Sequence, residues 1–257
     1  MRDNRTKRIM VARGLALGVS ITIPDPFVAE AIGGAGFDFV LIDTEHSPIT
    51  VDQLQMLLIA LRTSASTVFV RPAGNDATLI KQILDLGAEG VVVPEVDDAS
   101  SCAAAVAAAR YPPLGRRGFG PRRAARLDGG RAAYLERAND EVAVLVMVES
   151  ADAVANIDGL LATPGLDGIM VGPADLAVTM GHLNDLNHPD VGAGIADVRA
   201  ACQRNSVPFG IFAATEPAAR RWAAEGATFM TIGADTQFLD QGLAKSRALA
   251  QSLRQAP

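Results

Sequence analysis

The chain is poor in cysteine and lacks long apolar runs. Its two cysteines, Cys102 and Cys202, lie in alanine-rich, helix-like stretches that are remote from any His or Cys partner. We therefore expect reduced, packed thiols in a cytoplasmic protein, rather than a disulfide or a thiolate metal site. No segment approaches the ~20 apolar residues that span a bilayer, so we expect no membrane partner. We interpret residues 1–13 as a basic tail before the first strand, not as a signal peptide.

Positive charge is also in deficit. The formal net charge is −6 at pH 7, and the sequence pI is about 5.1. Such a chain should repel a phosphate backbone, so we expect no nucleic acid partner. The 257 residues, 49% of them hydrophobic, suffice for one large core, and we predict a single domain over residues 1–257.

Eight short apolar runs indicate buried parallel strands. They lie at residues 15–22, 37–43, 67–71, 90–94, 142–149, 168–172, 208–212 and 229–233. Helical patterns follow them at residues 27–34, 51–61, 77–86, 99–109, 151–161, 189–204, 217–225 and 236–253. Eight alternating units predict an α/β fold closed into a (β/α)8 TIM barrel. An open doubly wound sheet is the alternative, but no Gly-x-Gly-x-x-Gly follows the first strand.

Two stretches interrupt this alternation. Residues 111–131 are rich in glycine, proline and arginine and are too long for a simple connector, and such loops are usually functional or disordered. Residues 181–189 form a second interruption, after the sixth strand.

Acidic residues end two consecutive strands. Glu149 ends the fifth strand, and Asp175 follows the sixth. Neighbouring strands bring such carboxylates to one point at the barrel mouth, where they repel each other unless a cation joins them. Oxygen ligands of this kind suit Mg²⁺ or Mn²⁺, or else Co²⁺. The alternative is that both carboxylates are helix N-caps, since each precedes a helical stretch.

Other strand ends carry groups suited to acid–base chemistry and anion binding. His46 follows the second strand, three residues after Asp43, as suits a general base held in one tautomer; a structural loop histidine is the alternative. Arg71 ends the third strand and can bind a carboxylate or stabilise an oxyanion, unless it only forms a salt bridge. The turn from Gly172 to Ala174 offers backbone N–H groups to an anion.

Lysine is scarce, and its absence from the strand ends excludes one mechanism. Lys7, Lys81 and Lys245 are the only lysines, against 20 arginines, and none ends a strand. Barrel enzymes that form a Schiff base need a lysine inside the barrel. If this barrel makes or breaks a carbon–carbon bond through an enolate, a metal must accept the charge. Asp85, one helical turn after Lys81, is most simply a surface ion pair.

Taken together, these segments resemble the HpcH/HpaI aldolase family of metal-dependent pyruvate aldolases. The matching stretches are FDFVLIDTEHSP at 37–48, VRP at 70–72, LIKQILDLGA at 79–88, YPPLGRRG at 111–118, VES at 148–150 and DGIMVGPADL at 167–176, with a weaker match at 226–233. The resemblance covers roughly residues 15–240.

The resemblance implies a role for each matching residue. Glu149 and Asp175 correspond to the metal ligands, and His46 to the catalytic base. Asp85 corresponds to an acid that raises the basicity of that histidine, which replaces the surface-pair interpretation. Further correspondences are Arg71 for transition-state stabilisation, Ala174 for a backbone contact to the pyruvate carboxylate, and Phe212 for an apolar substrate contact. Proteins of this family are often hexamers, so a homo-oligomer is implied.

One residue departs from the family pattern. Met147 stands where the family usually has glutamine, two residues before the metal glutamate, and it points into the barrel. A thioether cannot replace the donors of an amide, so substrate polarity or the waters around the metal should differ.

Three hypotheses for function follow. The first is a metal-dependent aldolase that cleaves a 4-hydroxy-2-oxo acid to pyruvate and an aldehyde. The second is a lyase for a malyl- or citramalyl-type thioester, in which the arginines of residues 116–126 contact coenzyme phosphates; these arginines can equally form a lid or a subunit contact. The third is a non-catalytic binding barrel, against which the set of His46, Arg71, Glu149 and Asp175 argues.

Overall fold

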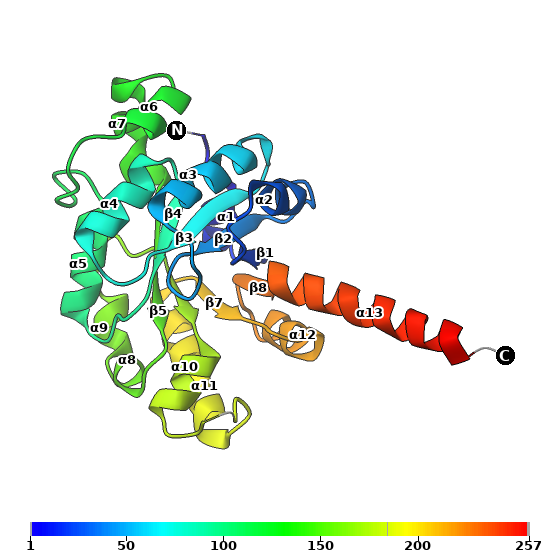
Figure 1. Ribbon diagram of the computed structural model, residues 1–257. Helices are drawn as coiled ribbons and strands as arrows, with labels where there is room; N and C mark the ends of the chain where they lie inside the picture. Colours follow the sequence, from blue (N-terminus) through cyan, green and yellow to red (C-terminus); the bar gives the residue numbers. More distant parts are fainter. Residues whose placement is uncertain (1, 184, 256–257) are drawn as a thin grey trace.

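The computed structural model describes residues 2–183 and 185–255, and it forms a closed barrel of eight parallel strands (Figure 1). The strands are β1 (Ala16–Ile21), β2 (Phe39–Asp43), β3 (Thr67–Arg71), β4 (Gly90–Val93), β5 (Ala143–Val148), β6 (Gly168–Val171), β7 (Phe209–Phe212) and β8 (Phe229–Ala234). Each strand pairs with the next along the chain, and β8 pairs with β1. The predicted TIM barrel is confirmed, and the open sheet is excluded.

The barrel is filled by side chains, not hollow. Phe39, Phe69 and Phe229 lie inside it, with ring centroids 5.5 Å apart for Phe39–Phe69 and 6.4 Å for Phe39–Phe229. Gly18 and Gly210 make room for these rings, because a Cβ at either position would lie within 2.4 Å of a phenylalanine ring. This packing closes the barrel interior.

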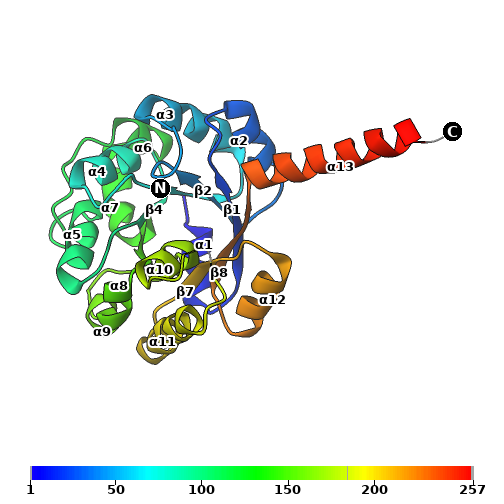
Figure 2. The same ribbon diagram turned by 60° about the horizontal axis from the view of Figure 1, so that its bottom comes forward.

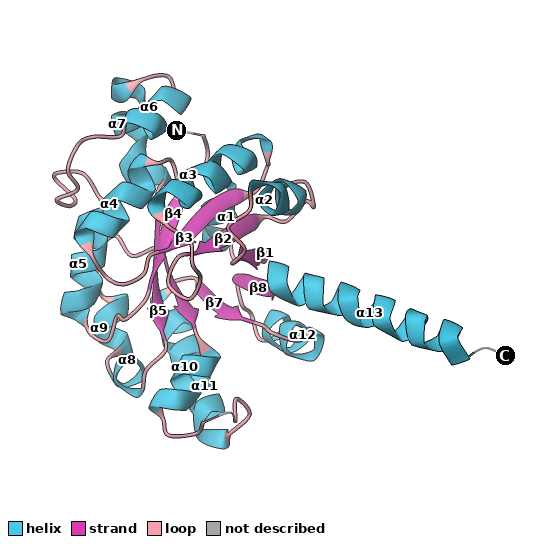
Figure 3. Ribbon diagram, in the orientation of Figure 1, coloured by secondary structure: helices cyan, strands magenta, loops and turns pink. Residues whose placement is uncertain are grey.

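Helices surround the strands (Figure 3). They are α1 (Arg5–Val11), α2 (Pro26–Gly33), α3 (Val51–Ala60), α4 (Ala77–Asp85), α5 (Ala99–Ala109), α6 (Arg122–Leu127), α7 (Arg131–Glu141), α8 (Ala151–Ala155), α9 (Ile157–Leu161), α10 (Pro173–Thr179), α11 (Pro189–Asn205), α12 (Glu216–Ala224) and α13 (Asp235–Gln255). Capping boxes at Thr50 and Asp98 fix the starts of α3 and α5. The single helix predicted over residues 151–161 is two helices that meet at Asn156.

The start of the chain is not a basic tail, contrary to our expectation. It forms α1, whose N-cap Asn4 is fully buried and donates to the carbonyls of Glu89 and Glu141. Met10, at the other end of α1, joins the phenylalanine cluster inside the barrel. The helix therefore packs at the amino ends of the strands, opposite the end where catalytic residues of barrels lie.

The long segment 111–131 is ordered and contains α6. Arg117 within it has a fully buried side chain and pairs with Asp85, with 2.7 Å between Nη2 and Oδ1. Arg123 donates to the carbonyls of Leu86 and Leu58. Because Leu86 precedes β4, these arginines lie toward the amino ends of the strands.

The last helix leaves the barrel. Helix α13 projects away from the strands in both views (Figures 1 and 2). Every residue from Thr236 to Arg254 is exposed. Within the described residues, no helix combines the length and apolar character that crossing a membrane requires.

Candidate active site

Asp43 and Arg71 form a buried ion pair at the carboxyl ends of β2 and β3. The two residues are partners in the strand register, so the sheet itself places them side by side. Arg71 Nε lies 3.0 Å from Asp43 Oδ1, and Arg71 Nη2 lies 2.6 Å from Oδ2, a bidentate contact. Burial opposes ionisation of Asp43, but the hydrogen bonds and charge of Arg71 outweigh it and lower the pKa of this carboxyl.

The structure gives Asp43 a different task from the one expected. Its Oδ1 accepts from the backbone N–H groups of Glu45 and His46, and its carboxylate holds the Arg71 guanidinium. The imidazole of His46 instead lies near Glu45, with 3.6 Å between Nε2 and Oε2, and its side chain is 60% exposed. Asp43 thus orients the arginine and the loop, and Glu45 is the acidic neighbour of the imidazole.

Glu45 is a site residue that the sequence argument did not select. Arg71 Nη1 lies 3.1 Å from its Oε2, at an angle that does not form a hydrogen bond. Burial raises the pKa of Glu45; Arg71 and His46 oppose this rise, while the negative charges of Asp43 and Asp175 add to it. The sequence did contain a signal for Glu45, because it is an acidic residue two positions after the end of β2.

Glu149 follows β5 and faces the same point. Ser150, not Glu149, is the N-cap of α8, so the helix-cap alternative fails for this residue. The backbone N–H of Glu95 donates to Glu149 Oε1 at 3.0 Å, and Glu95 holds a left-handed φ of 56°. A non-glycine residue in that region is uncommon and strained, which is typical of functional sites.

Asp175 lies in the first turn of α10, whose N-cap is Gly172. It therefore does not cap the helix either. Burial raises the pKa of Glu149, and the negative charges of Glu45 and Asp175 raise it further, against the Glu95 N–H and Arg71. Asp175 also raises the pKa of Glu45. The negative charges of Glu45, Glu149 and Asp175 therefore act on one another at this mouth and oppose their joint ionisation.

This repulsion is the physical test of a metal site, and the residues fit one. Neighbouring carboxylates whose negative charges oppose ionisation, as at Glu45 and Glu149, are stabilised by a shared divalent cation. Gly172 preserves the space, because a Cβ there would lie 3.2 Å from Glu149 Oε2 and 2.9 Å from Met147 Cε. A bulkier residue would press on the carboxylate.

The remaining predicted contacts also lie at this mouth. Met147 is 1% exposed, and its Sδ lies 3.6 Å from Arg71 Nη1. The ring of Phe212 lies 5.7 Å from Arg71 Cζ. Ala174 occupies the first turn of α10, beside Asp175. Arg71 thus has both acidic neighbours, Asp43 and Glu45, and apolar ones, the Met147 thioether and the Phe212 ring.

Asp85 is the predicted residue that the single chain does not bring to the site. It is the last residue of α4, which runs back from the mouth toward the amino end of β4. His46 follows the carboxyl end of β2, so the two lie at opposite ends of the barrel. Asp85 pairs with Arg117 rather than with Lys81, contrary to the surface-pair interpretation.

An eight-stranded barrel with carboxylates, an arginine and a histidine at the carboxyl ends of its strands defines an enzyme of the TIM-barrel class. The chain belongs to the HpcH/HpaI aldolase/citrate lyase family, whose sequence model matches residues 20–241. Membership makes it a carbon–carbon lyase and confirms the resemblance inferred from the motifs.

Similar proteins agree with this assignment. A curated 5-keto-4-deoxy-D-glucarate aldolase from Klebsiella pneumoniae subsp. pneumoniae is 38% identical over 232 residues, which cover 90% of this chain and 91% of that protein. The crystal structure of an HpcH/HpaI aldolase/citrate lyase family protein from Burkholderia cenocepacia J2315 has a TM-score of 0.91 and 36% identity, over 98% of this chain and 100% of that one. The crystal structure of the citrate synthase SbnG has a TM-score of 0.89 and 27% identity, over 99% and 100% of the two chains.

Proposed function

We propose that the protein is a divalent-metal-dependent aldolase that cleaves a 4-hydroxy-2-oxo acid to pyruvate and an aldehyde, and that it catalyses the reverse addition. The observation that carries this proposal is the set of half-buried carboxylates at the barrel mouth: Glu45 lies 3.1 Å from Arg71, and the charges of Glu45 and Asp175 both act on Glu149. Relatives that are 38% identical act, by name, on 5-keto-4-deoxy-D-glucarate. We extend that substrate class, a dicarboxylic sugar acid with a 2-oxo end, to this chain.

Glu149 and Asp175 would hold the cation, with Mg²⁺ or Mn²⁺ as the ions that suit oxygen ligands and Co²⁺ as a further candidate. When bound, the ion supplies Lewis-acid stabilisation of the negative charge that develops on the 2-oxo oxygen, worth several kcal/mol. Glu45 lies near enough to add negative charge to the site, and the Glu95 N–H fixes the orientation of Glu149.

The chain's own groups then carry the proton and the substrate charge. His46 stands exposed at the mouth and removes the proton from the C4 hydroxyl as the C3–C4 bond breaks. A proton then returns to C3 of the enolate to give pyruvate. A positioned base of this kind contributes about 10²–10⁴-fold. Arg71, fixed in orientation by Asp43, stabilises the negative charge of the pyruvate enolate. Met147 and Phe212 give the site an apolar wall beside Arg71, and backbone N–H groups at Ala174 would contact the pyruvate carboxylate.

The distal part of the substrate has a candidate recess. A cavity of about 110 Å³ lies beside Phe212 and is lined by Ser20, Phe212, Ala213, Ala214, Thr231, Gly233, Ala234 and Gln237. The buried hydroxyl of Thr231 has no hydrogen-bond partner among the described residues. A polar group of the aldehyde half would satisfy this hydroxyl, because buried hydroxyls normally have a partner.

The thioester alternative finds less support. It required loop arginines that are free to contact coenzyme phosphates at the mouth. Arg117 is fully buried against Asp85, and Arg123 donates to backbone carbonyls near the amino end of β4. The contacts of Arg117 and Arg123 therefore hold these two side chains at the amino end of the barrel, away from the mouth.

We further propose that the protein is a homo-oligomer in which α13 packs on a second copy. Five exposed apolar side chains of α13 fall on one side of the helix: Phe238, Leu239, Leu243, Leu249 and Leu253. An amphipathic helix of 21 residues, roughly 31 Å long, does not expose its apolar side to water without a partner. Exchange between copies gives each barrel the eighth outer helix that its own chain directs away (Figure 2).

Cleavage of 5-keto-4-deoxy-D-glucarate tests the proposed activity. Pyruvate release is measured with and without Mg²⁺ or Mn²⁺ after chelation, for the wild type, Glu149→Ala and His46→Ala. We expect metal-dependent turnover that Glu149→Ala abolishes, while His46→Ala loses turnover but keeps near-normal Mn²⁺ affinity by titration calorimetry. Undiminished turnover of Glu149→Ala after chelation would refute the metal assignment, and a parallel loss of Mn²⁺ binding in His46→Ala would refute the separate role of the base.

A further inference from the structure

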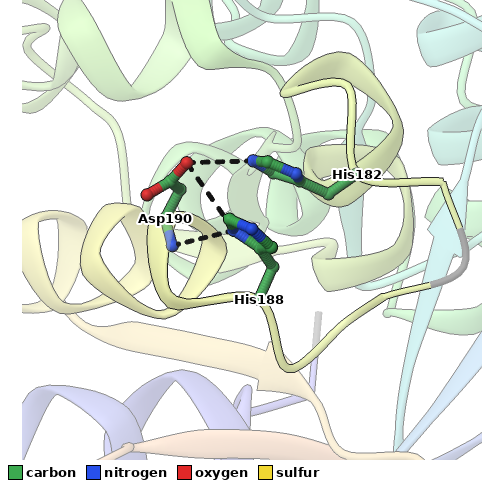
Figure 4. A group of neighbouring side chains, drawn as sticks. All are labelled: His182, His188 and Asp190. Atoms are coloured by element: carbon green, nitrogen blue, oxygen red, sulfur yellow. Dashed lines mark hydrogen bonds and ion pairs between the residues drawn. The ribbon is translucent and has the colours of Figure 1, made fainter.

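We propose that His182, His188 and Asp190 form a second divalent-cation site, which takes a first-row transition ion such as Zn²⁺. One ligand atom from each residue lies within 4.8 Å of the other two, between α10 and α11 (Figure 4). The chain has three histidines in all, and two of them meet here. His46 is the third and belongs to the barrel mouth, so this cluster is outside the site described above.

The two imidazole rings present one edge to the same carboxylate oxygen. His182 Nε2 lies 3.0 Å from Asp190 Oδ2, and His188 Nδ1 lies 3.6 Å from that oxygen. The rings are stacked, with centroids 3.4 Å apart and planes 13° apart. A cation at this edge would lie among one nitrogen of each ring and an oxygen of Asp190, because these three atoms are within 4.8 Å of one another.

Hydrogen bonds order the backbone of all three residues before any ion binds. His182 N donates to the carbonyl of Ala177 at 2.8 Å, and His188 N donates to that of Asp185 at 3.1 Å. His188 is also the N-cap of α11, where its Nδ1 accepts from Asp190 N at 3.2 Å. The backbone around the ligands is thus ordered in advance, and His188 Nδ1 gives up its bond to Asp190 N when it binds the ion.

The ligand chemistry separates this cluster from the barrel mouth. Two imidazoles and one carboxylate suit Zn²⁺ and its first-row neighbours, whereas the all-carboxylate site suits Mg²⁺ and Mn²⁺. The side chains of His182 and His188 are 23% and 33% exposed, and that of Asp190 is 68% exposed. An ion would therefore contact the two imidazoles and the carboxylate on one side and solvent on the other, where water completes its coordination.

An ion here would join the end of α10 to the start of α11. His182 hydrogen-bonds to α10 through Ala177, and Asp175 lies two residues before Ala177 on the same helix. The site would act as a clamp on the helix that carries one of the proposed ligands of the catalytic metal. It supplies no group to the reaction itself.

Titration with Co²⁺ in a large excess of Mg²⁺ tests the proposal, because Mg²⁺ competes for the oxygen site and Co²⁺ in a four-coordinate site with imidazole ligands absorbs strongly in the visible. We expect the wild type to develop this absorption with one equivalent per chain. The double variant His182→Ala/His188→Ala should lose it, and Asp190→Asn should weaken Co²⁺ binding by about tenfold or more. Asp197→Asn, a matched charge change at an exposed position farther along α11, should leave it unchanged. Equal absorption in the wild type and the double variant overturns the site.

A measurement on the wild-type protein alone guards against misfolded variants. Less than one equivalent of Zn²⁺, again with excess Mg²⁺, should shift the imidazole NMR signals of His182 and His188 and leave those of His46 in place. Shifts confined to His46, or no shift at one equivalent, would contradict the proposal.

Discussion

At the scale of single residues, the site depends on which groups the strand register places next to each other. Asp43 and Arg71 are opposite each other on β2 and β3, so their ion pair follows from the sheet. The sequence indicated both residues because each ends an apolar run. It could not indicate Glu95, which acts through its backbone N–H from a left-handed conformation, a property that side-chain chemistry does not reveal.

Replacing Asp43 with asparagine should misorient Arg71. Asparagine offers one oxygen in place of two and carries no charge, so it holds the guanidinium less firmly. The guanidinium can then turn toward Glu45, whose Oε2 lies 3.1 Å from Arg71 Nη1. We expect kcat to fall about 10- to 100-fold with a smaller change in KM, because a misplacement of ~1 Å has effects of this size. Steady-state pyruvate release measures both constants. A kcat within twofold of the wild type would show that Asp43 does not orient Arg71.

Gly172→Ala should weaken the catalytic metal site. The added Cβ would lie 3.2 Å from Glu149 Oε2 and 2.9 Å from Met147 Cε, so the carboxylate must shift. We expect Mn²⁺ affinity to fall about 10- to 100-fold, the range seen when the support of a metal ligand is lost. Titration calorimetry measures this. Gly192→Ala in α11 is the control, since its Cβ meets nothing within 4 Å; equal affinities for the two variants would contradict the prediction.

At the scale of elements, all eight strands were predictable, because each is a short apolar run with glycine, proline or polar residues at its ends. The helices α1, α6 and α7 were not predicted. Helix α1 reads RTKRIMV and α6 reads RRAARL, which are short and basic. Helices of this length are unstable alone and depend on tertiary contacts, here the buried Asn4 cap and the contacts of Arg123. These tertiary contacts cannot be predicted from the periodicity of apolar residues in the sequence.

The proposed exchange of α13 predicts the effect of a charge on its apolar side. Leu243→Glu should shift the protein from oligomer to smaller species, because a buried unpaired carboxylate is costly. Gln241→Glu adds the same charge on the polar side of the helix and should leave the assembly intact. Sedimentation velocity separates the two results. An unchanged sedimentation coefficient for Leu243→Glu would show that this side of α13 is not in the interface.

At the scale of the whole molecule, the barrel separates the mouth, with Glu149 and Asp175, from the opposite end, where α1 packs and Asp85 pairs with Arg117. The family resemblance connects Asp85 with His46, yet one chain places them at opposite ends. Any contact between them would therefore have to cross to another copy. A single sequence could not reveal such a contact between copies, because the spacing of residues along one chain does not show whether they meet within that chain or across an interface.

The most direct measurement is the exchange of the pyruvate methyl protons for deuterium, followed by NMR in D₂O. Exchange reports enolate formation without any knowledge of the aldehyde. We predict exchange by the wild type with Mg²⁺ or Mn²⁺, its loss on chelation and recovery on metal return, and no exchange by Glu149→Ala or Asp175→Ala under any of these conditions. Exchange that persists in both variants would contradict the claim that these two carboxylates hold the ion that stabilises the enolate.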